Sequence, residues 1–280
     1  MNKPFFSIII PTLNEEKYLP KLLKDLSQQG FTDFEIIIVD GNSEDKTIEK
    51  AKQFKKKFKI STISVDKKSV SYQRNTGVKK AQSDWLIFMD ADNKIPNYFL
   101  QGIKYQLEKN ADTDYFTCWV NPKDVNLKNR PIIKSLNVFL DVSSKIDPYA
   151  LGALIGVKKS IFKKIQFDED VKYAEDSKFV KKLFNANYQF KCFREPQFSY
   201  SLRRFEKEGI LKLARIVAKA FSNKVIGKEF DESVDYPMLG GSYYEKTDLR
   251  FFNKFQSFIK TASKKQLSQA KKLFEYIKEF

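Results

Sequence analysis

The sequence predicts an α/β fold with a mostly parallel sheet flanked by helices and followed by a helical C-terminal extension. Three observations support this fold class. Short apolar runs alternate with helical patterns through the first half of the chain, these runs are rich in β-branched residues, and the pattern becomes mostly helical from Gly209 onward. Strands that alternate with helices in this way pair in parallel through right-handed crossovers.

Four strands are predicted over residues 7–10, 35–39, 59–65 and 85–89. All except the third are continuous apolar runs, which is typical of parallel strands that are buried on both faces. A further strand is expected over residues 114–120.

Helical patterns lie between these strands. Leucines spaced three or four positions apart predict the first helix over residues 18–26, and further helices are expected roughly over 44–58, 70–81 and 96–109. Residues 121–150 contain three prolines and show weak periodicity. We expect a substrate loop with a short helix in this last segment.

The composition is that of a basic globular protein. With 280 residues and 42% hydrophobic content, the chain can form a large domain with a buried core. Lys and Arg outnumber Asp and Glu by 51 to 35, for a formal net charge of +16. A positive field attracts nucleotides, anionic lipid head groups and nucleic acid without distinguishing them. No detached basic tail carries the excess, so we expect no nucleic-acid partner.

Histidine is absent, so any metal binding or proton transfer must rest on carboxylates. Cys118 and Cys192 show no CxxC spacing, which is typical of reduced thiols in an intracellular protein. The chain begins with a strand-like run rather than a signal peptide, and no run of 18 apolar residues occurs. We therefore expect a cytoplasmic protein that does not span a membrane.

Polar residues follow three predicted strands where each strand ends, at 11–16, 40–43 and 90–92. Ligands of open α/β sheets bind at the carboxyl ends of the strands. Asp90 and Asp92 lie on alternate residues, so both can project around one point. Carboxylates together with phosphate oxygens commonly hold Mg²⁺ or Mn²⁺ in nucleotide enzymes. An acidic turn that merely ends the strand is the alternative interpretation.

In their order and spacing, these segments resemble family 2 of the glycosyltransferases. The resemblance covers roughly residues 4–210 and implies a Rossmann-like catalytic domain of GT-A type over 1–208, with the helical extension over 209–280. It also implies transfer of a sugar from a nucleoside-diphosphate sugar to a hydroxyl acceptor, with inversion. The segments that carry the resemblance are Pro11–Glu16, Val39–Thr47, Gln73–Gly77, Asp90–Asp92, Gly152–Lys159, Phe167–Glu169, Glu175–Asp176 and Ser201–Phe205.

The resemblance implies a nucleotide pocket built on the first three of these segments. Thr12 and Glu15 are expected to line this pocket, and Asp40 is expected to accept a hydrogen bond from the base. Arg74 is expected near the base or the diphosphate, where a guanidinium can hold oxyanions in a fixed fork.

The remaining positions implied for the donor surround the diphosphate. Asp90 is expected toward the ribose, with Ala91 beside it, and Asp92 toward a Mn²⁺ or Mg²⁺ ion. Arg204 is a candidate for holding the leaving diphosphate, with Arg203 as the competing candidate and a solvated basic pair as the alternative. Many processive relatives have a Gln or Arg three positions before an Arg-Trp pair, and this chain departs from that pattern, which weakens any claim of processive synthesis.

Asp176 matches the catalytic base of the family. A carboxylate within hydrogen-bond reach of a hydroxyl nucleophile accepts its proton as the new bond forms. The alternative is that Glu175 and Asp176 are an exposed acidic pair at the start of a helix over 177–184, where carboxylates interact favourably with the helix dipole.

The segment from Gly209 to Lys228 is predicted to be a basic amphipathic helix. Such a helix can dock peripherally on an anionic membrane surface, which suits a lipid-linked acceptor, or it can pack on the catalytic domain. The donor base, of UDP or GDP type, the sugar and the carbohydrate or lipid-linked acceptor are not determined by these motifs.

Two other functions are weighed against the transferase. A sugar-1-phosphate nucleotidyltransferase normally has a Gly-rich turn ending in Arg or Lys after the first strand, and residues 11–16 contain no glycine. A non-catalytic module that binds only the sugar nucleotide is the second alternative, and the presence of Asp92 and Asp176 counts against it.

Overall fold

The computed structural model describes residues 3–124, 130–145, 148–171 and 174–201. The predicted extension over 209–280 and both candidate arginines, Arg203 and Arg204, lie outside these residues. Within the described ranges, no helix is long and apolar enough to cross a membrane.

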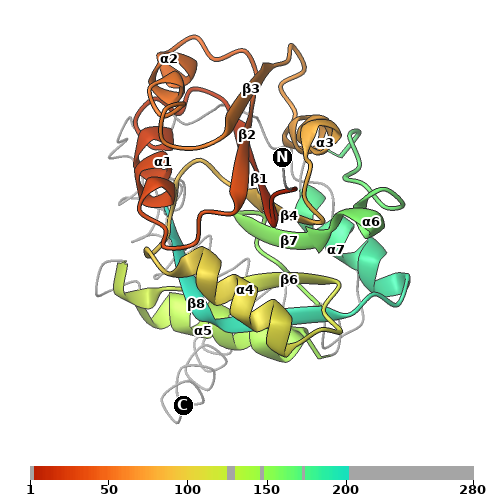
Figure 1. Cartoon of the computed structure of the whole chain (residues 1–280). Coiled ribbons are helices and arrows are strands. Elements are labelled where there is room, and N and C mark those ends of the chain that lie inside the picture. Colours follow the sequence, from red (N-terminus) through yellow and green to blue (C-terminus); the bar gives the residue numbers. More distant parts are fainter. Residues whose placement is uncertain (1–2, 125–129, 146–147, 172–173, 202–280) are drawn as a thin grey trace, which may run out of the picture.

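One sheet of eight strands organises the described chain, in the order β3-β2-β1-β4-β7-β6-β8-β5 (Figure 1). The first four strands of this order pair in parallel, and β6 and β8 are also parallel, whereas β7 and β5 pair antiparallel to their neighbours. The mostly parallel α/β sheet is therefore confirmed. The strands are β1 (Phe6–Thr12), β2 (Phe34–Asp40), β3 (Ile60–Ser64), β4 (Trp85–Met89), β5 (Asn93–Lys94), β6 (Tyr115–Val120), β7 (Leu154–Lys158) and β8 (Phe190–Tyr200).

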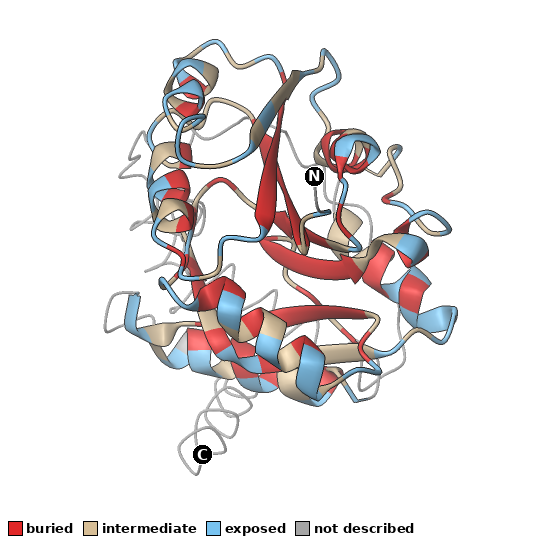
Figure 2. Ribbon diagram, viewed as in Figure 1, coloured by how far each residue is buried: buried red, intermediate tan, exposed pale blue. Residues whose placement is uncertain are grey.

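Helices cover both faces of this sheet. One apolar cluster joins α1, α4 and α5 to one face, and a second joins α3, α6 and α7 to the other (Figures 1 and 2). Alternate residues of β1 divide between them, since Ile8 and Ile10 belong to the first cluster and Ile9 to the second. The helices are α1 (Leu19–Ser27), α2 (Thr47–Lys52), α3 (Val70–Lys80), α4 (Phe99–Lys109), α5 (Arg130–Ser143), α6 (Lys159–Phe162) and α7 (Glu175–Asn185), with a short 3₁₀ helix η1 (Pro122–Asp124).

The five predicted strands are present, with ends that differ by at most two residues from those expected. Helix α2 is much shorter than the predicted 44–58. The loop with a short helix expected over 121–150 instead contains the 14-residue helix α5. Pro131 is compatible with this helix because it occupies the first turn, where its missing N–H has no intrahelical partner.

Helix α5 is held to the sheet by apolar and polar contacts. Ile133 and Leu140 are buried in the first cluster. The Asn137 side chain binds the end of β6, since the Val120 amide donates to its Oδ1 at 2.9 Å and its Nδ2 donates to the Val120 carbonyl at 2.7 Å. The amide of Asn137 thus satisfies backbone groups that the end of a strand would otherwise leave buried and unpaired.

Gly77 of α3 contacts β1 and β2 so closely that a side chain has no room. A Cβ atom at this position would lie 2.5 Å from Cγ2 of Ile9 and 3.2 Å from Cγ2 of Val39. We expect Gly77→Ala to lower the free energy of unfolding by roughly 1 to 3 kcal/mol, because overpacking displaces buried side chains. Denaturant unfolding measures this loss. Gly30→Ala is the matched control, since a Cβ atom at that position would have nothing within 4 Å, and equal stability of the two variants would contradict the prediction.

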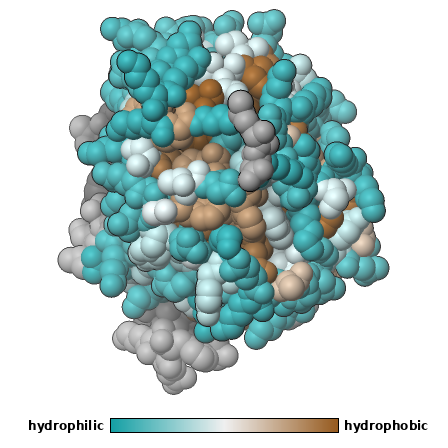
Figure 3. Space-filling view, in the orientation of Figure 1, coloured by the Kyte–Doolittle hydropathy of each residue, from teal (hydrophilic) through white to brown (hydrophobic). Residues whose placement is uncertain are grey.

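The surface is mostly hydrophilic in the view of Figure 3. In the view of Figure 3, hydrophilic residues form most of the periphery of this face, and hydrophobic residues gather toward its middle. Individual exposed apolar side chains include Tyr98 and Tyr105 of α4 and Val138 and Val142 of α5. Individual exposed apolar side chains such as these four are ordinary for a folded chain.

Candidate active site

The loops after β1 and β2 form one preorganised unit around Asp40. This residue is 2% exposed, and its Oδ1 accepts hydrogen bonds from Thr12 Oγ1 at 2.8 Å and from Ser43 Oγ at 2.6 Å. Its Oδ2 accepts from the Ser43 amide at 2.8 Å. Asn42 has a positive φ of 62°, which turns the chain so that Ser43 reaches back. A carboxylate has about four acceptor positions, so Oδ2 keeps capacity for a further donor.

Glu15 lies in the loop after β1 and is tied to α2. Its amide donates to Thr47 Oγ1 at 2.8 Å, and the neighbouring Asn14 amide donates to Ser43 Oγ at 2.8 Å. Beneath both loops, Gln73 of α3 donates through Nε2 to the carbonyls of Thr12 and Val39, each at 2.8 Å. Thr12, Glu15 and Asp40 are therefore brought together at one end of the parallel strands.

Asp90 and Asp92 follow β4 at the same edge of the sheet. The Asp90 amide and Asn93 Nδ2 both donate to the Ala153 carbonyl, at 3.1 Å and 2.6 Å, which fastens this turn to the residue before β7. Ala91 is 3% exposed, so its small side chain is enclosed while its two acidic neighbours are partly accessible.

Arg74 of α3 lies at the centre of a cluster of carboxylates. Its Nη2 donates to Asp90 Oδ1 at 3.1 Å and to the Gly152 carbonyl at 2.8 Å, and its Nη1 donates to Glu175 Oε1 at 3.1 Å. The guanidinium also lies over the ring of Phe167, with 5.0 Å from Cζ to the ring centroid. These contacts enclose Arg74 almost completely, leaving 1% of the residue exposed.

Asp176 lies in the first turn of α7, beside the Gly152 segment. Its Oδ2 accepts from the Gly152 amide at 2.7 Å, and its Oδ1 accepts from the Ser177 amide at 2.7 Å. Any side chain at position 152 would collide with this carboxylate, because a Cβ there would lie 2.7 Å from Oδ2. Ala174, which precedes the helix, has a positive φ of 54° that sets the direction in which α7 begins.

The electrostatics of the cluster favour protonation of two of these carboxyls. Desolvation is the largest effect that raises the pKa of Asp176, and the negative charge of Glu175 is the second. Arg74 and two backbone amides lower this pKa, and the net result is a pKa of about 7. Partial burial likewise raises the pKa of Asp90, with Arg74 acting in the opposite direction. Burial and the charges of Asp92 and Asp90 raise the pKa of the Tyr200 hydroxyl, so this side chain from β8 also borders the acidic turn.

A metal at this edge would meet oxygen ligands only. No group of three or more His, Cys, Asp or Glu side chains suited to holding a metal ion occurs among the described residues. Asp90 and Asp92 nevertheless lie on alternate residues, and several acidic groups surround a single buried guanidinium. This arrangement fits a hard divalent cation that completes its coordination shell with phosphate oxygens and water.

The structure thus forms two groups from the predicted residues. Thr12, Glu15 and Asp40 make one, and Arg74 and Asp90 make the other together with Gly152 and Asp176. Sequence reasoning assigned no role to Glu175, Gly152 or Tyr200. The first two lie within the segments that carry the family resemblance, but their significance depends on contacts with Arg74 and Asp176 that no local pattern reveals.

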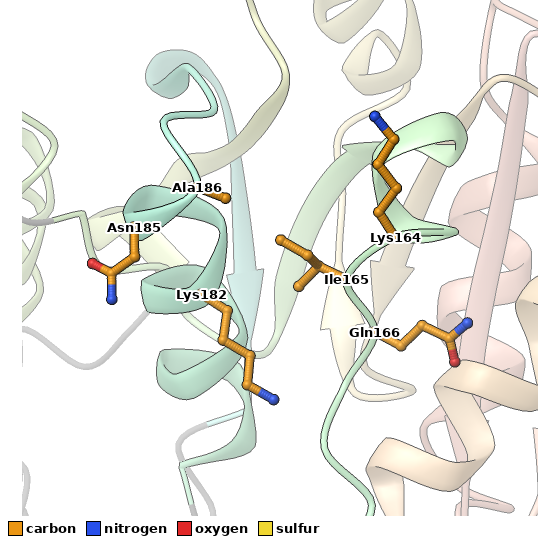
Figure 4. Close-up of a pocket in the computed structure, with 6 residues that line it drawn as sticks. All are labelled: Lys164, Ile165, Gln166, Lys182, Asn185 and Ala186. Carbon is orange, nitrogen blue, oxygen red and sulfur yellow. The ribbon is translucent and has the colours of Figure 1, made fainter.

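A separate hollow lies at the opposite end of α7. It has a volume of about 470 Å³ and is open to solvent (Figure 4). Asp176 is in the first turn of α7, whereas the hollow is lined by Lys182 and Asn185 of the last turn and by Ala186 directly after the helix. The two features are therefore distinct. The lining residues are Lys164, Ile165, Gln166, Lys182, Asn185 and Ala186.

An open α/β sheet with polar loops at the carboxyl ends of its strands is the architecture of a ligand-binding α/β domain. Residues 7–166 match glycosyl transferase family 2, and the chain belongs to that family. The predicted membership and the GT-A type of α/β fold are thereby confirmed.

Curated relatives of the chain are named as glycosyltransferases of different specificities. The chain is 27% identical over 208 residues to the poly(ribitol-phosphate) beta-N-acetylglucosaminyltransferase TarS of Staphylococcus aureus, covering 71% of this chain and 36% of the relative. It therefore spans about a third of that protein's length. A GalNAc(5)-diNAcBac-PP-undecaprenol beta-1,3-glucosyltransferase of Campylobacter jejuni is 25% identical over 266 residues, covering 86% of this chain and 81% of the relative.

Solved structures show the same fold at lower identity. A crystal structure of S. aureus TarS 1-349 has a TM-score of 0.55 and 21% identity, covering 82% of this chain and 67% of that one. The mannosyltransferase PcManGT from Pyrobaculum calidifontis, in complex with GDP-Man and Mn²⁺, has a TM-score of 0.59 and 15% identity, covering 99% of this chain and 81% of that one.

Proposed function

We propose that the chain transfers a sugar from a nucleoside-diphosphate sugar to a hydroxyl acceptor with inversion, with Asp176 as the general base. The observation that carries this proposal is the placement of Asp176. It lies on the first turn of α7 with a raised pKa, and it is connected through Gly152 and Arg74 to the acidic turn after β4. Family membership supports the reaction class.

The donor is of UDP or GDP type in this proposal. Thr12, Glu15 and Asp40 bind the nucleoside, and Asp90 with Ala91 faces the ribose. Structural relatives solved with UDP-GlcNAc and with GDP-Man support both base types. Relatives named for poly(ribitol phosphate) and for an undecaprenol-linked glycan make polymeric and lipid-linked hydroxyls the first acceptors to test.

The protein's own groups perform the proton transfer. A hydroxyl nucleophile at neutral pH needs a base within hydrogen-bond reach, and an effective base has a pKa near the working pH. Asp176 meets the second requirement because desolvation and Glu175 raise its pKa to about 7. The Gly152 and Ser177 amides hold both of its oxygens, so the carboxylate is oriented before an acceptor arrives.

Asp92 would hold Mn²⁺ or Mg²⁺ at the acidic turn. When bound, such an ion neutralises charge on the departing nucleoside diphosphate. Structural relatives solved with Mn²⁺ support a divalent ion. In this proposal residues 1–208 form the catalytic domain, in which Arg204 acts on the diphosphate, and any peripheral contact with a membrane is on the cytoplasmic side. Arg204 and the predicted helical extension over 209–280 lie outside the described residues.

The nucleotide proposal predicts a stabilisation by ligand. We expect UDP or GDP with Mn²⁺ to raise the melting temperature, because a ligand that binds only the folded state stabilises it by RT ln(1 + [L]/Kd), about 2.7 kcal/mol at a hundredfold excess over Kd. Differential scanning fluorimetry measures the shift. Asp92→Asn should lose the metal-dependent part of the shift, while Asp112→Asn, at an exposed carboxylate paired with Lys191, should keep it. No shift with any nucleoside diphosphate and either metal would refute the nucleotide-sugar assignment.

A further inference from the structure

We propose that Arg74 is a positioning residue rather than a residue that binds the donor. It couples the acidic turn after β4 to the first turn of α7, which carries the proposed general base, Asp176. This inference rests on the proposed function, since it describes how the same site is assembled. The observation behind it is that one buried guanidinium binds Asp90, Glu175 and the Gly152 carbonyl at once.

Burial places the guanidinium behind the carboxylates. The side chain of Arg74 is 1% exposed, whereas those of Asp90 and Glu175 are 39% and 17% exposed. Solvent therefore reaches the two carboxylates more readily than the cation between them. An anionic diphosphate approaching from solvent would meet carboxylate oxygens before it met the guanidinium. This argues against direct binding of the donor by Arg74.

The contacts of Arg74 join segments that are distant in sequence. Position 74 is separated from Asp90 by 16 positions, from Gly152 by 78 and from Glu175 by 101. Each of these contacts is to a different segment: the end of β4, the residues before β7 and the start of α7. Displacement of the guanidinium would therefore release three segments of the site together.

Gly152 carries the connection to Asp176. Its carbonyl accepts from Arg74 Nη2 at 2.8 Å, and its amide donates to Asp176 Oδ2 at 2.7 Å. Arg74 also anchors Glu175, the residue adjacent to the base in sequence. The base is thus held from two sides by groups that Arg74 itself positions, and the absence of a side chain at Gly152 allows this close contact.

Arg74→Met removes the hydrogen-bonding fork and keeps an unbranched apolar side chain. We expect kcat to fall about 10²-fold, since misplacement of a reacting group by about 1 Å has that effect. Donor Kd, measured by calorimetry with a nucleoside diphosphate and Mn²⁺, should stay within about threefold, because the donor pocket keeps its own contacts. Amide hydrogen exchange at Gly152 and Ser177 should accelerate, because their acceptor is no longer held in place.

The control is Arg194→Met. Like Arg74, Arg194 pairs with a carboxylate, that of Asp141, and its guanidinium lies over an aromatic ring, that of Trp119. Unlike Arg74, its side chain is 65% exposed, and its partners lie outside the described site. This variant should leave kcat and the exchange at Gly152 unchanged. If Arg74→Met folds poorly, Arg74→Lys provides the same test, because lysine keeps the charge but cannot bind both carboxylates as a fork.

The outcomes separate this inference from the proposed function. Weaker donor binding by the Arg74 variants, with unchanged amide hydrogen exchange at Gly152 and Ser177, would show that Arg74 binds the donor. This result would overturn the inference. Absence of transfer by the parent protein would instead defeat the proposed function. In that case the exchange measurement still decides whether Arg74 holds the α7 turn in place.

Discussion

Asp176→Asn should lower the rate of sugar transfer by about 10²- to 10⁴-fold, the usual contribution of a positioned general base. That range corresponds to roughly 3 to 5 kcal/mol in the activation barrier. The substitution keeps the size of the side chain and removes the oxygen that accepts the proton. Donor affinity should remain close to that of the parent, since the residue contacts the Gly152 and Ser177 amides rather than the nucleotide loops.

Single-turnover measurement at saturating donor tests this expectation without interference from product release. Asp168→Asn is the matched control, because Asp168 lies near the same helix, pairs with Lys182 and has a lowered rather than raised pKa. Its transfer rate should equal that of the parent. Undiminished transfer by Asp176→Asn would remove this residue from the mechanism and leave Glu175 as the next candidate. Loss of transfer with retained donor binding would argue against a module that only binds sugar nucleotides.

The pH dependence of transfer should follow the ionisation of Asp176. Its pKa is raised to about 7, and a general base must be unprotonated, so kcat/KM should fall about tenfold for each pH unit below 7. At pH 5 the expected loss is about 100-fold relative to the plateau, by the same proportionality. The slow residual transfer of Asp176→Asn should lack this acidic limb. A profile of the parent that stays flat from about pH 5 to 8 would contradict the assignment.

The same ionisation has a consequence for stability that needs no substrate. The pKa of Asp176 in the folded state, about 7, lies above the ordinary aspartate value of 3.8. Between pH 3.8 and 7, Asp176 therefore keeps its proton in the folded protein and has lost it in the unfolded chain. The contribution of this bound proton to the free energy of unfolding is fully present below pH 3.8 and is lost as the pH rises through 7. Asp176→Asn should therefore become more stable relative to the parent as the pH rises from about 5 to 8, because only the parent loses this contribution. Parallel stability curves would contradict the raised pKa.

Much of the parallel part of the sheet was predictable from local sequence. The isoleucine runs of β1 and β2 are buried along their whole length, so composition alone indicates strands covered on both faces. The position of Asp90 and Asp92 directly after β4 followed from the same pattern. These features are visible in sequence because each depends on residues that are neighbours along the chain.

Elements that depend on distant partners were missed. The strand β7 is sandwiched between β4 and β6, and its residues appeared in the sequence only as part of a family motif. The strand β8 contains Pro196, which argues against a strand, yet it pairs in parallel with β6 and antiparallel with β5. The helix α5 was obscured by Pro131 in its first turn and by the prolines on either side of it, Pro122 and Pro148. For β7 and β8 tertiary packing outweighed the local signal, whereas the buried residues Ile133, Leu136 and Leu140 of α5 do recur at helical spacing.

Local sequence was sufficient to predict the family, the parallel strands and the carboxylates that lie at the ends of those strands. Which of these carboxylates share a charge partner became visible only in three dimensions. Arg74 meets Glu175 across 101 positions, and Asp176 is enclosed because the residues before β7 fold against the start of α7. Desolvation and long-range ion pairing depend on proximity in space, and these two effects set the pKa on which the proposed chemistry depends.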